Sequence, residues 1–155
     1  MATEIPTIGK VYNIAGEELL PHRPPFLFVD TLVSSGDEGA VGEYTFTEEK
    51  NEFFKGHFPG APIVPGVVLV ETMAQTAGAG LVARDFFGGM RKPGFVLAKV
   101  ESARFRKPVR PGDRFVTVAM TERVKSIVGT FDLKGYVNGE LAAEAKVICM
   151  LGGEK

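Results

Sequence analysis

The pattern of apolar and polar positions divides most of the chain into two strands, one long helix and four further strands. Residues 25–33 are almost continuously apolar and residues 40–47 alternate, so both segments are predicted as strands. From Gly66 to Phe87 nothing breaks a helix, and the segment begins after Pro65 and ends before a glycine pair. Four strand-like runs follow, at 95–107, 114–123, 126–137 and 140–151.

The long helix is apolar almost all round, so it needs cover on every side. A curved antiparallel sheet wrapped around it supplies that cover, with a second subunit for the remainder, which predicts an α+β fold. Asn138 and Gly139 form a strong signal for a hairpin between the last two strands. At 155 residues we expect a single domain over 1–155, with 1–18 as an entry segment and a short helix at 15–20.

The segment around the helix start holds the most telling chemistry. His57 lies on a loop that three prolines keep from being helical, and Glu71 follows fourteen residues later, inside the helix. An imidazole titrates near neutral pH and so suits a general base. Burial in an apolar helix raises the pKa of a carboxyl group, which favours the protonated form that serves as an acid. The pair therefore indicates general acid/base catalysis.

The sequence HFPGAPIVPGVVLVETMAQ, residues 57–75, resembles the active-site signature of the FabZ-type 3-hydroxyacyl-acyl carrier protein dehydratases. Two further blocks agree with that family: LLPHRPPFLFVD at 19–30 and ARFRKPVRPGD at 103–113. The resemblance implies the hotdog fold, in which a curved antiparallel sheet wraps around one long buried helix. It also implies dehydration of 3-hydroxyacyl-acyl carrier protein to the trans-2-enoyl form in fatty acid biosynthesis.

In such a dehydratase we expect His57 to remove the C2 proton of the substrate and Glu71 to act on the 3-hydroxyl group. The Gly66 backbone N–H, at a helix N-terminus, is expected to bind the thioester carbonyl oxygen. Which residue hands the proton to the leaving hydroxyl stays open. Gln75 lies one turn beyond Glu71 and is either an orienting residue or a buried polar neighbour. The resemblance further implies a homodimer with shared sites, and assembly of dimers into a hexamer.

Charge is unevenly distributed although the net charge is −1. Residues 91–114 carry eight basic and two acidic side chains, whereas residues 1–56 carry ten acidic and four basic ones. The basic segment is either an ordinary solvated face or a surface that steers an acidic carrier protein. Nucleic acid is not expected as a partner, because no such motif is present. The candidate carrier-binding residues are Arg104, Arg106, Lys107 and Arg110.

Other polar residues suggest no further chemistry. His22 has no paired acid in its own block and is interpreted as structural, and the lone Cys149 as a buried small side chain. Two distant histidines without cysteine ligands do not indicate a metal site. The sequence contains no phosphate-binding motif, so no nucleotide cofactor is predicted. Glu71 near the middle of the apolar helix argues against a membrane span. The N-terminus has no secretory signal, so a cytoplasmic location is expected.

Four alternatives to this function remain. A related dehydratase-isomerase would typically have aspartate in place of Glu71, and a hotdog thioesterase usually lacks the histidine–proline pattern. A non-catalytic acyl-thioester binding module would not need both His57 and Glu71. A dehydratase of a specialised lipid or polyketide pathway would carry the same residues.

Overall fold

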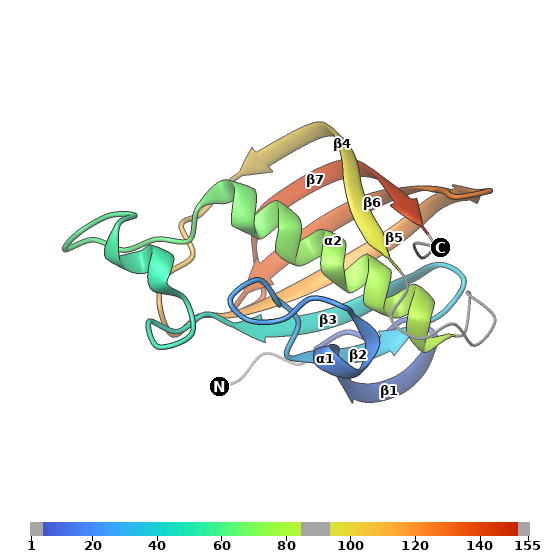
Figure 1. Ribbon diagram of the computed structural model, residues 1–155, viewed down its shortest axis with the longest axis horizontal. Coiled ribbons are helices and arrows are strands. Elements are labelled where there is room, and N and C mark those ends of the chain that lie inside the picture. Colours follow the sequence, from blue (N-terminus) through green and yellow to red (C-terminus); the bar gives the residue numbers. More distant parts are fainter. Residues whose placement is uncertain (1–4, 85–93, 152–155) are drawn as a thin grey trace.

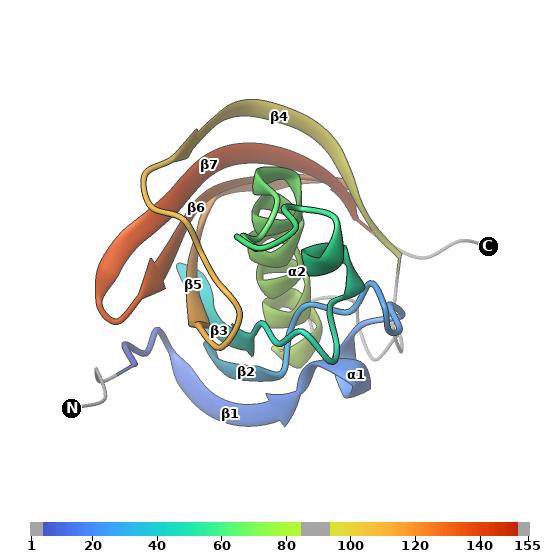
Figure 2. The same ribbon diagram turned by 90° about the vertical axis from the view of Figure 1, so that its left-hand side faces the viewer.

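A seven-stranded antiparallel sheet wraps around one long helix in the computed structural model, which describes residues 5–84 and 94–151 (Figures 1 and 2). The strand order is β1-β2-β3-β5-β6-β7-β4. This arrangement confirms the predicted α+β hotdog fold. The elements are β1 Lys10–Ala15, α1 Gly16–Leu19, β2 Thr31–Ser35, β3 Gly39–Thr45, the 3₁₀ helix η1 Glu52–Lys55, α2 Gly66–Ala83, β4 Phe95–Phe105, β5 Arg114–Lys125, β6 Val128–Val137 and β7 Glu140–Leu151.

The N-terminal third differs most from prediction. Residues 10–15 of the entry segment form β1, an edge strand that pairs with β2. The strand predicted at 25–33 begins only at Thr31, because Phe26 and Phe28 bond to α2 instead of the sheet, and backbone bonding to β3 starts at Asp30. The Phe28 N–H donates to the Gln75 side chain on α2, so it is not available to a neighbouring strand.

Helix α2 begins at Gly66 as predicted but ends at Ala83 rather than at Phe87. Arg84 leaves the helical conformation, with φ −88° and ψ 16°, while its N–H still donates to the Gly80 carbonyl. The predicted glycine stop at 88–89 and the phenylalanine pair at 86–87 lie outside the described residues. By length and composition α2 could cross a membrane, but 67% of it is buried inside the protein, as in a core helix.

Small residues let α2 approach the sheet closely. A Cβ on Gly80 would lie 2.4 Å from the Ala40 Cβ, and one on Gly78 would lie 2.8 Å from the Phe95 ring. Every residue from Thr72 to Leu81 is buried, so this half of the helix has no solvent face. The predicted apolar face of β7 packs in the same core, through Ala143, Ala145, Val147 and Cys149.

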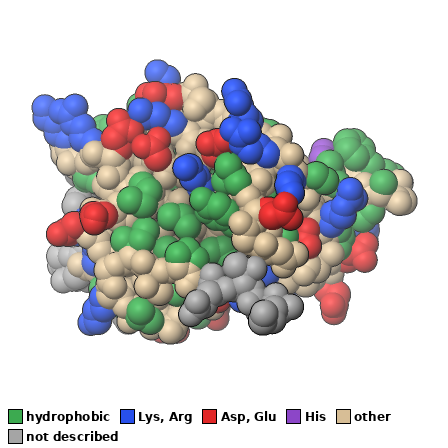
Figure 3. Space-filling model, turned by 180° about the vertical axis from the view of Figure 1, so that it is seen from behind, with side chains coloured by type: hydrophobic (Ala, Val, Ile, Leu, Met, Phe, Trp, Pro, Cys, Tyr) green, Lys and Arg blue, Asp and Glu red, His purple; other side chains and the backbone are tan. Residues whose placement is uncertain are grey.

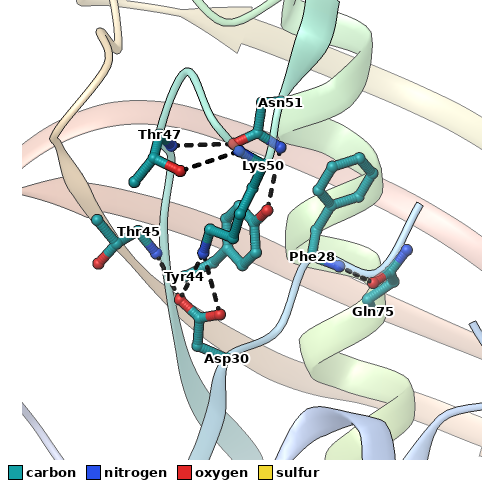
Figure 4. A network of polar contacts seen from close by, with 8 residues as sticks. All are labelled: Phe28, Asp30, Tyr44, Thr45, Thr47, Lys50, Asn51 and Gln75. Atoms are coloured by element: carbon teal, nitrogen blue, oxygen red, sulfur yellow. Dashed lines mark hydrogen bonds and ion pairs between the residues drawn. The ribbon is translucent and has the colours of Figure 1, made fainter. Parts of the chain in front are cut away.

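A polar network joins the end of β3 to the loop that leads to α2 (Figure 4). Asn51 donates to the Tyr44 hydroxyl at 3.0 Å and accepts from the Thr47 N–H at 3.0 Å. The Lys50 ammonium lies over the Tyr44 ring and 3.3 Å from the Asp30 carboxylate. Because buried polar groups are costly when unpaired, this network fixes the start of the loop that carries His57.

The sheet has two further features that bear on assembly. Edge strand β4 exposes three large apolar side chains, Val96, Val100 and Phe105, which are 44–61% accessible. On the sheet face away from α2, Ile5 and Ile8 pack against Val33, Val41 and Val116. Figure 3 shows apolar side chains gathered in the middle of that outer face, with charged side chains around them.

The predicted hairpin at Asn138 and Gly139 is confirmed, with φ of 50° and 77°.

Candidate active site

His57 lies near the start of the loop that follows η1, and backbone hydrogen bonds hold it there. Its N–H donates to the Phe53 carbonyl at 3.0 Å, and its carbonyl accepts from the Ile63 N–H at 2.9 Å. The ring Nδ1 lies 3.1 Å from the Ile63 carbonyl oxygen, which can only accept. Nδ1 therefore carries the hydrogen in the neutral ring, and Nε2 keeps its lone pair. A base at this position would use Nε2.

A pocket of about 290 Å³ connects His57 with the N-terminus of α2. Gly66 and Leu69 line it from the helix, and Phe105 lines it from β4. No described residue accepts a hydrogen bond from the Gly66 N–H, which leaves this donor and the positive end of the helix dipole for a ligand. A Cβ on residue 66 would lie 2.7 Å from the Phe105 ring, so glycine also makes room for that ring.

Glu71 does not line this pocket, so one chain does not bring the two predicted catalytic residues into the same pocket. The Glu71 carboxyl group faces Gln75 and His22, at 2.7 Å and 3.7 Å from its Oε2 atom. Burial raises the pKa of Glu71 above its ordinary value, and the hydrogen bond from Gln75 partly opposes that shift. The protonated form that an acid catalyst needs is thereby favoured.

Gln75 is fully buried, and three hydrogen bonds fix its amide (Figure 4 shows the bond to Phe28). Its Oε1 accepts from the Phe28 N–H at 2.7 Å, and its Nε2 donates to the Phe26 carbonyl at 3.0 Å. The amide cannot flip without losing both bonds, so Nε2 must also be the group that donates to Glu71 Oε2. A proton on Glu71 is consequently expected on Oε1, the other oxygen. These contacts are compatible with both interpretations of Gln75, as an orienting residue and as a buried polar neighbour.

His22 lies beside Glu71, although the sequence favoured a purely structural role for it. The two residues are 49 positions apart, and their contact arises because residues 20–28 cross α2. No spacing rule connects these positions, so no local pattern in the sequence predicts the contact. The His22 side chain is largely buried, and burial lowers its pKa, which favours the neutral ring.

Two of the four basic residues of the predicted carrier-binding segment form ion pairs with acidic side chains, and the other two form none with the described residues. Arg106 forms an ion pair with Glu144, and Lys107 forms one with Glu140, so acidic neighbours offset the charge of both. Arg104 and Arg110 are exposed and have no ion pair with a described side chain. Arg106 and Lys107 also line the pocket that holds His57. The basic segment therefore reaches the mouth of the candidate site.

Within residues 5–84 and 94–151 no group of histidine, cysteine and carboxylate side chains could hold a metal ion. Cys149 is buried, as predicted. Burial, with the charge of Glu71 as a lesser cause, raises the pKa of its thiol to about 12. The thiol is therefore neutral at physiological pH and serves as a packing group.

Comparison with known proteins agrees with this fold. The chain resembles a solved structure, the dehydratase heterocomplex ApeI:P from Xenorhabdus doucetiae, with a TM-score of 0.76 over 91% of this chain and 93% of that one. Their sequence identity is only 14%, so this likeness concerns the fold. A family model described as a FabA-like domain matches residues 20–146.

Two curated relatives narrow the assignment. The 3-hydroxyacyl-[acyl-carrier-protein] dehydratase FabZ of Rhizobium rhizogenes is 41% identical over 135 residues, which is 86% of this chain and 83% of that protein. The bifunctional enzyme LpxC/FabZ of Chlorobaculum tepidum is 36% identical over 95% of this chain, which spans 31% of that longer enzyme. The chain belongs to the FabA-like domain family and, within it, to the FabZ-type dehydratases.

Proposed function

We propose that this protein dehydrates 3-hydroxyacyl-acyl carrier protein to trans-2-enoyl-acyl carrier protein in the fatty acid biosynthesis of the cytoplasm. The observation that carries the proposal is that His57 is arranged to accept a proton and Glu71 to donate one. In the neutral ring of His57 the free lone pair is on Nε2, because Nδ1 donates its hydrogen to the Ile63 carbonyl. Glu71 is biased toward its protonated form by burial. Together they supply the base and the acid that loss of water requires.

The proposed reaction begins when His57 Nε2 removes the C2 proton of the bound thioester. Electron density moves toward the thioester oxygen, where the Gly66 N–H and the helix dipole stabilise it. One such donor is worth about 2.7–4 kcal/mol in related settings. The C3–O bond then breaks, and Glu71 gives its proton to the leaving hydroxyl, which departs as water. The double bond forms between C2 and C3. No redox cofactor is needed, because no electrons are gained or lost overall.

The proposal includes an active site shared by two chains, with His57 from one subunit and Glu71 from the other. In one chain His57 opens into the pocket beside Phe105, whereas Glu71 faces His22 and Gln75. Strand β4 offers an unpaired edge with exposed Val96 and Val100, and its last residue, Phe105, lines that pocket. Such an edge suits pairing with a second copy. Three such dimers are proposed to form a hexamer, which sedimentation can test.

The direct test of function is incubation of the protein with 3-hydroxyacyl thioesters of several chain lengths. We expect trans-2-enoyl thioester as the product, detected by its ultraviolet absorbance and by mass spectrometry. Products with a shifted double bond would instead indicate a dehydratase-isomerase. Release of free thiol without enoyl product would indicate a thioesterase and defeat the proposal, and binding without turnover would indicate a binding module.

Charge reversal at Arg104 and Arg110 is expected to weaken turnover of carrier-bound substrate. These two exposed residues have no acidic partner among the described side chains, so they are the ones free to attract an acidic carrier protein. We expect the double variant Arg104→Glu/Arg110→Glu to lose about tenfold in kcat/KM at low salt, with a smaller loss at high salt because ions screen the attraction.

Two controls show whether the loss of activity comes from weaker docking of the carrier protein. A small soluble thioester should be turned over at the wild-type rate, since it has no carrier protein to steer. Lys125→Glu, a reversal at the far end of β5, should leave both substrates unaffected. Equal losses on the carrier-bound and the small substrate would point to a damaged site and contradict a docking role.

A further inference from the structure

His22 stands out among the polar side chains because its two ring nitrogens have opposite surroundings. Nε2 lies 3.7 Å from Glu71 Oε2, and the two side chains are 16% and 18% exposed. Nδ1 is buried and has no hydrogen-bond partner in the described part of the chain. A buried polar atom without a partner is unusual in a folded protein and calls for an explanation.

The burial of Nδ1 decides which tautomer the neutral ring adopts. A hydrogen on Nδ1 would be a buried N–H donor without an acceptor, which proteins avoid more strictly than a bare lone pair. The hydrogen therefore belongs on Nε2, where it points toward Glu71. At 3.7 Å the contact is longer than a hydrogen bond, and such contacts often shorten when substrate closes a site.

We propose that His22 is a positioning residue that donates from Nε2–H to Oε2 of Glu71. This inference rests on the proposed dehydration. Two donors, His22 Nε2 and Gln75 Nε2, then hold Oε2 from different sides. Oε1, with its proton, is the oxygen left to face the substrate hydroxyl.

The two hydrogen bonds to Glu71 Oε2 assist catalysis because they become stronger as the reaction proceeds. When Glu71 gives up its proton, negative charge appears on the carboxylate, and hydrogen bonds to a charged acceptor are stronger than those to a neutral one. Both donors are in place beforehand and need not reorganise. His22 thus stabilises the late part of proton transfer and not only the resting carboxyl group.

The titratable groups around Glu71 allow the effect of His22 on its pKa to be isolated. Cys149 on β7 interacts electrostatically with Glu71, but its thiol is neutral in the working range because its pKa is about 12. Gln75 is uncharged. In the proposed dimer the partner subunit's His57 is the remaining group. Because an N–H donor favours the carboxylate, removal of His22 should raise the pKa of Glu71 further above its ordinary value.

Three substitutions separate positioning from mere packing. A glutamine amide nitrogen can take the place of Nε2, whereas an asparagine amide nitrogen reaches only to the place of Nδ1. We expect His22→Gln to retain most of the wild-type kcat. His22→Asn and His22→Leu should lose about tenfold in kcat with KM little changed, as expected for an interaction that matters in the transition state. In both, the alkaline limb of the pH–rate profile, where protonated Glu71 is lost, should move to higher pH.

A direct titration of Glu71 tests the same idea without turnover. Carbon-13 NMR of labelled glutamate carboxyl groups, assigned with Glu71→Gln, should show a higher pKa in His22→Leu than in wild type, and a pKa near wild type in His22→Gln. Thermal unfolding should show all variants folded. Equal activity in the glutamine and asparagine variants, or an unmoved Glu71 pKa in His22→Leu, would overturn the positioning role. Wild-type protein that forms no enoyl product would overturn the proposed function instead, while the titration would still report on His22.

Discussion

A mixture of His57→Ala and Glu71→Gln proteins is expected to recover activity that neither variant has alone. Each variant should lose about 10²–10⁴ in kcat, because each lacks one of the two groups that transfer protons. After joint unfolding and reassembly, random pairing makes half of the dimers mixed. In a mixed dimer one shared site carries both lesions and the other is intact. About a quarter of all sites should therefore regain activity, measured as enoyl product per subunit.

The outcome depends on knowing that mixed dimers form. Two different affinity tags and tandem purification give a sample in which every dimer is mixed, and half of its sites should then be active. Variants mixed without unfolding serve as the control for spontaneous exchange. Purified mixed dimers that stay inactive would show that His57 and Glu71 act within one chain, against the separation between them described above.

Gly80→Ala is expected to destabilise the fold, although alanine is the better helix former. In an ordinary helix this change would stabilise by roughly 1 kcal/mol. Here the new methyl group would lie 2.4 Å from the Ala40 Cβ, and neither group can rotate away because both attach directly to backbone. Helix α2 must move off the sheet, so we expect a net loss of about 1–3 kcal/mol in the free energy of unfolding, measured by denaturant titration.

Removal of the opposing methyl group provides the matched control. Ala40→Gly alone should be mildly destabilising, because it takes a buried methyl group out of β3. Combined with Gly80→Ala it should restore the space, so the double variant should be at least about 1 kcal/mol more stable than the sum of the single effects predicts. Purely additive effects would show that the close approach of α2 to β3 does not limit stability.

The central and C-terminal elements were predictable because their patterns are local and strong. The apolar alternation of residues 140–151 and the Asn138-Gly139 turn gave β7 and its hairpin with the observed bounds. Proline at 65 and an uninterrupted apolar run gave the start of α2. His57 and Glu71 were found through a motif whose spacing holds them on a loop and on a helix. The fold class followed from the need to cover that helix.

The features that escaped prediction depend on contacts between distant segments. Residues 25–30 have a strand-like pattern, but Gln75 captures a backbone N–H that a strand would use. The contact of His22 with Glu71 follows from that same crossing. Two of the four basic residues proved to be paired with glutamates of β7, which no charge count along the chain reveals.

The Gln75 amide links the Phe28 backbone to the Glu71 carboxyl group, so a backbone proton reports on a side chain. The Phe28 N–H is buried and exchanges with solvent only when its bond to Gln75 opens. Its deuterium uptake therefore measures how often the bond between Phe28 and Gln75 opens. Hydrogen exchange at this single amide, followed in the resting protein and without any substrate, shows how stably Gln75 is held beside Glu71.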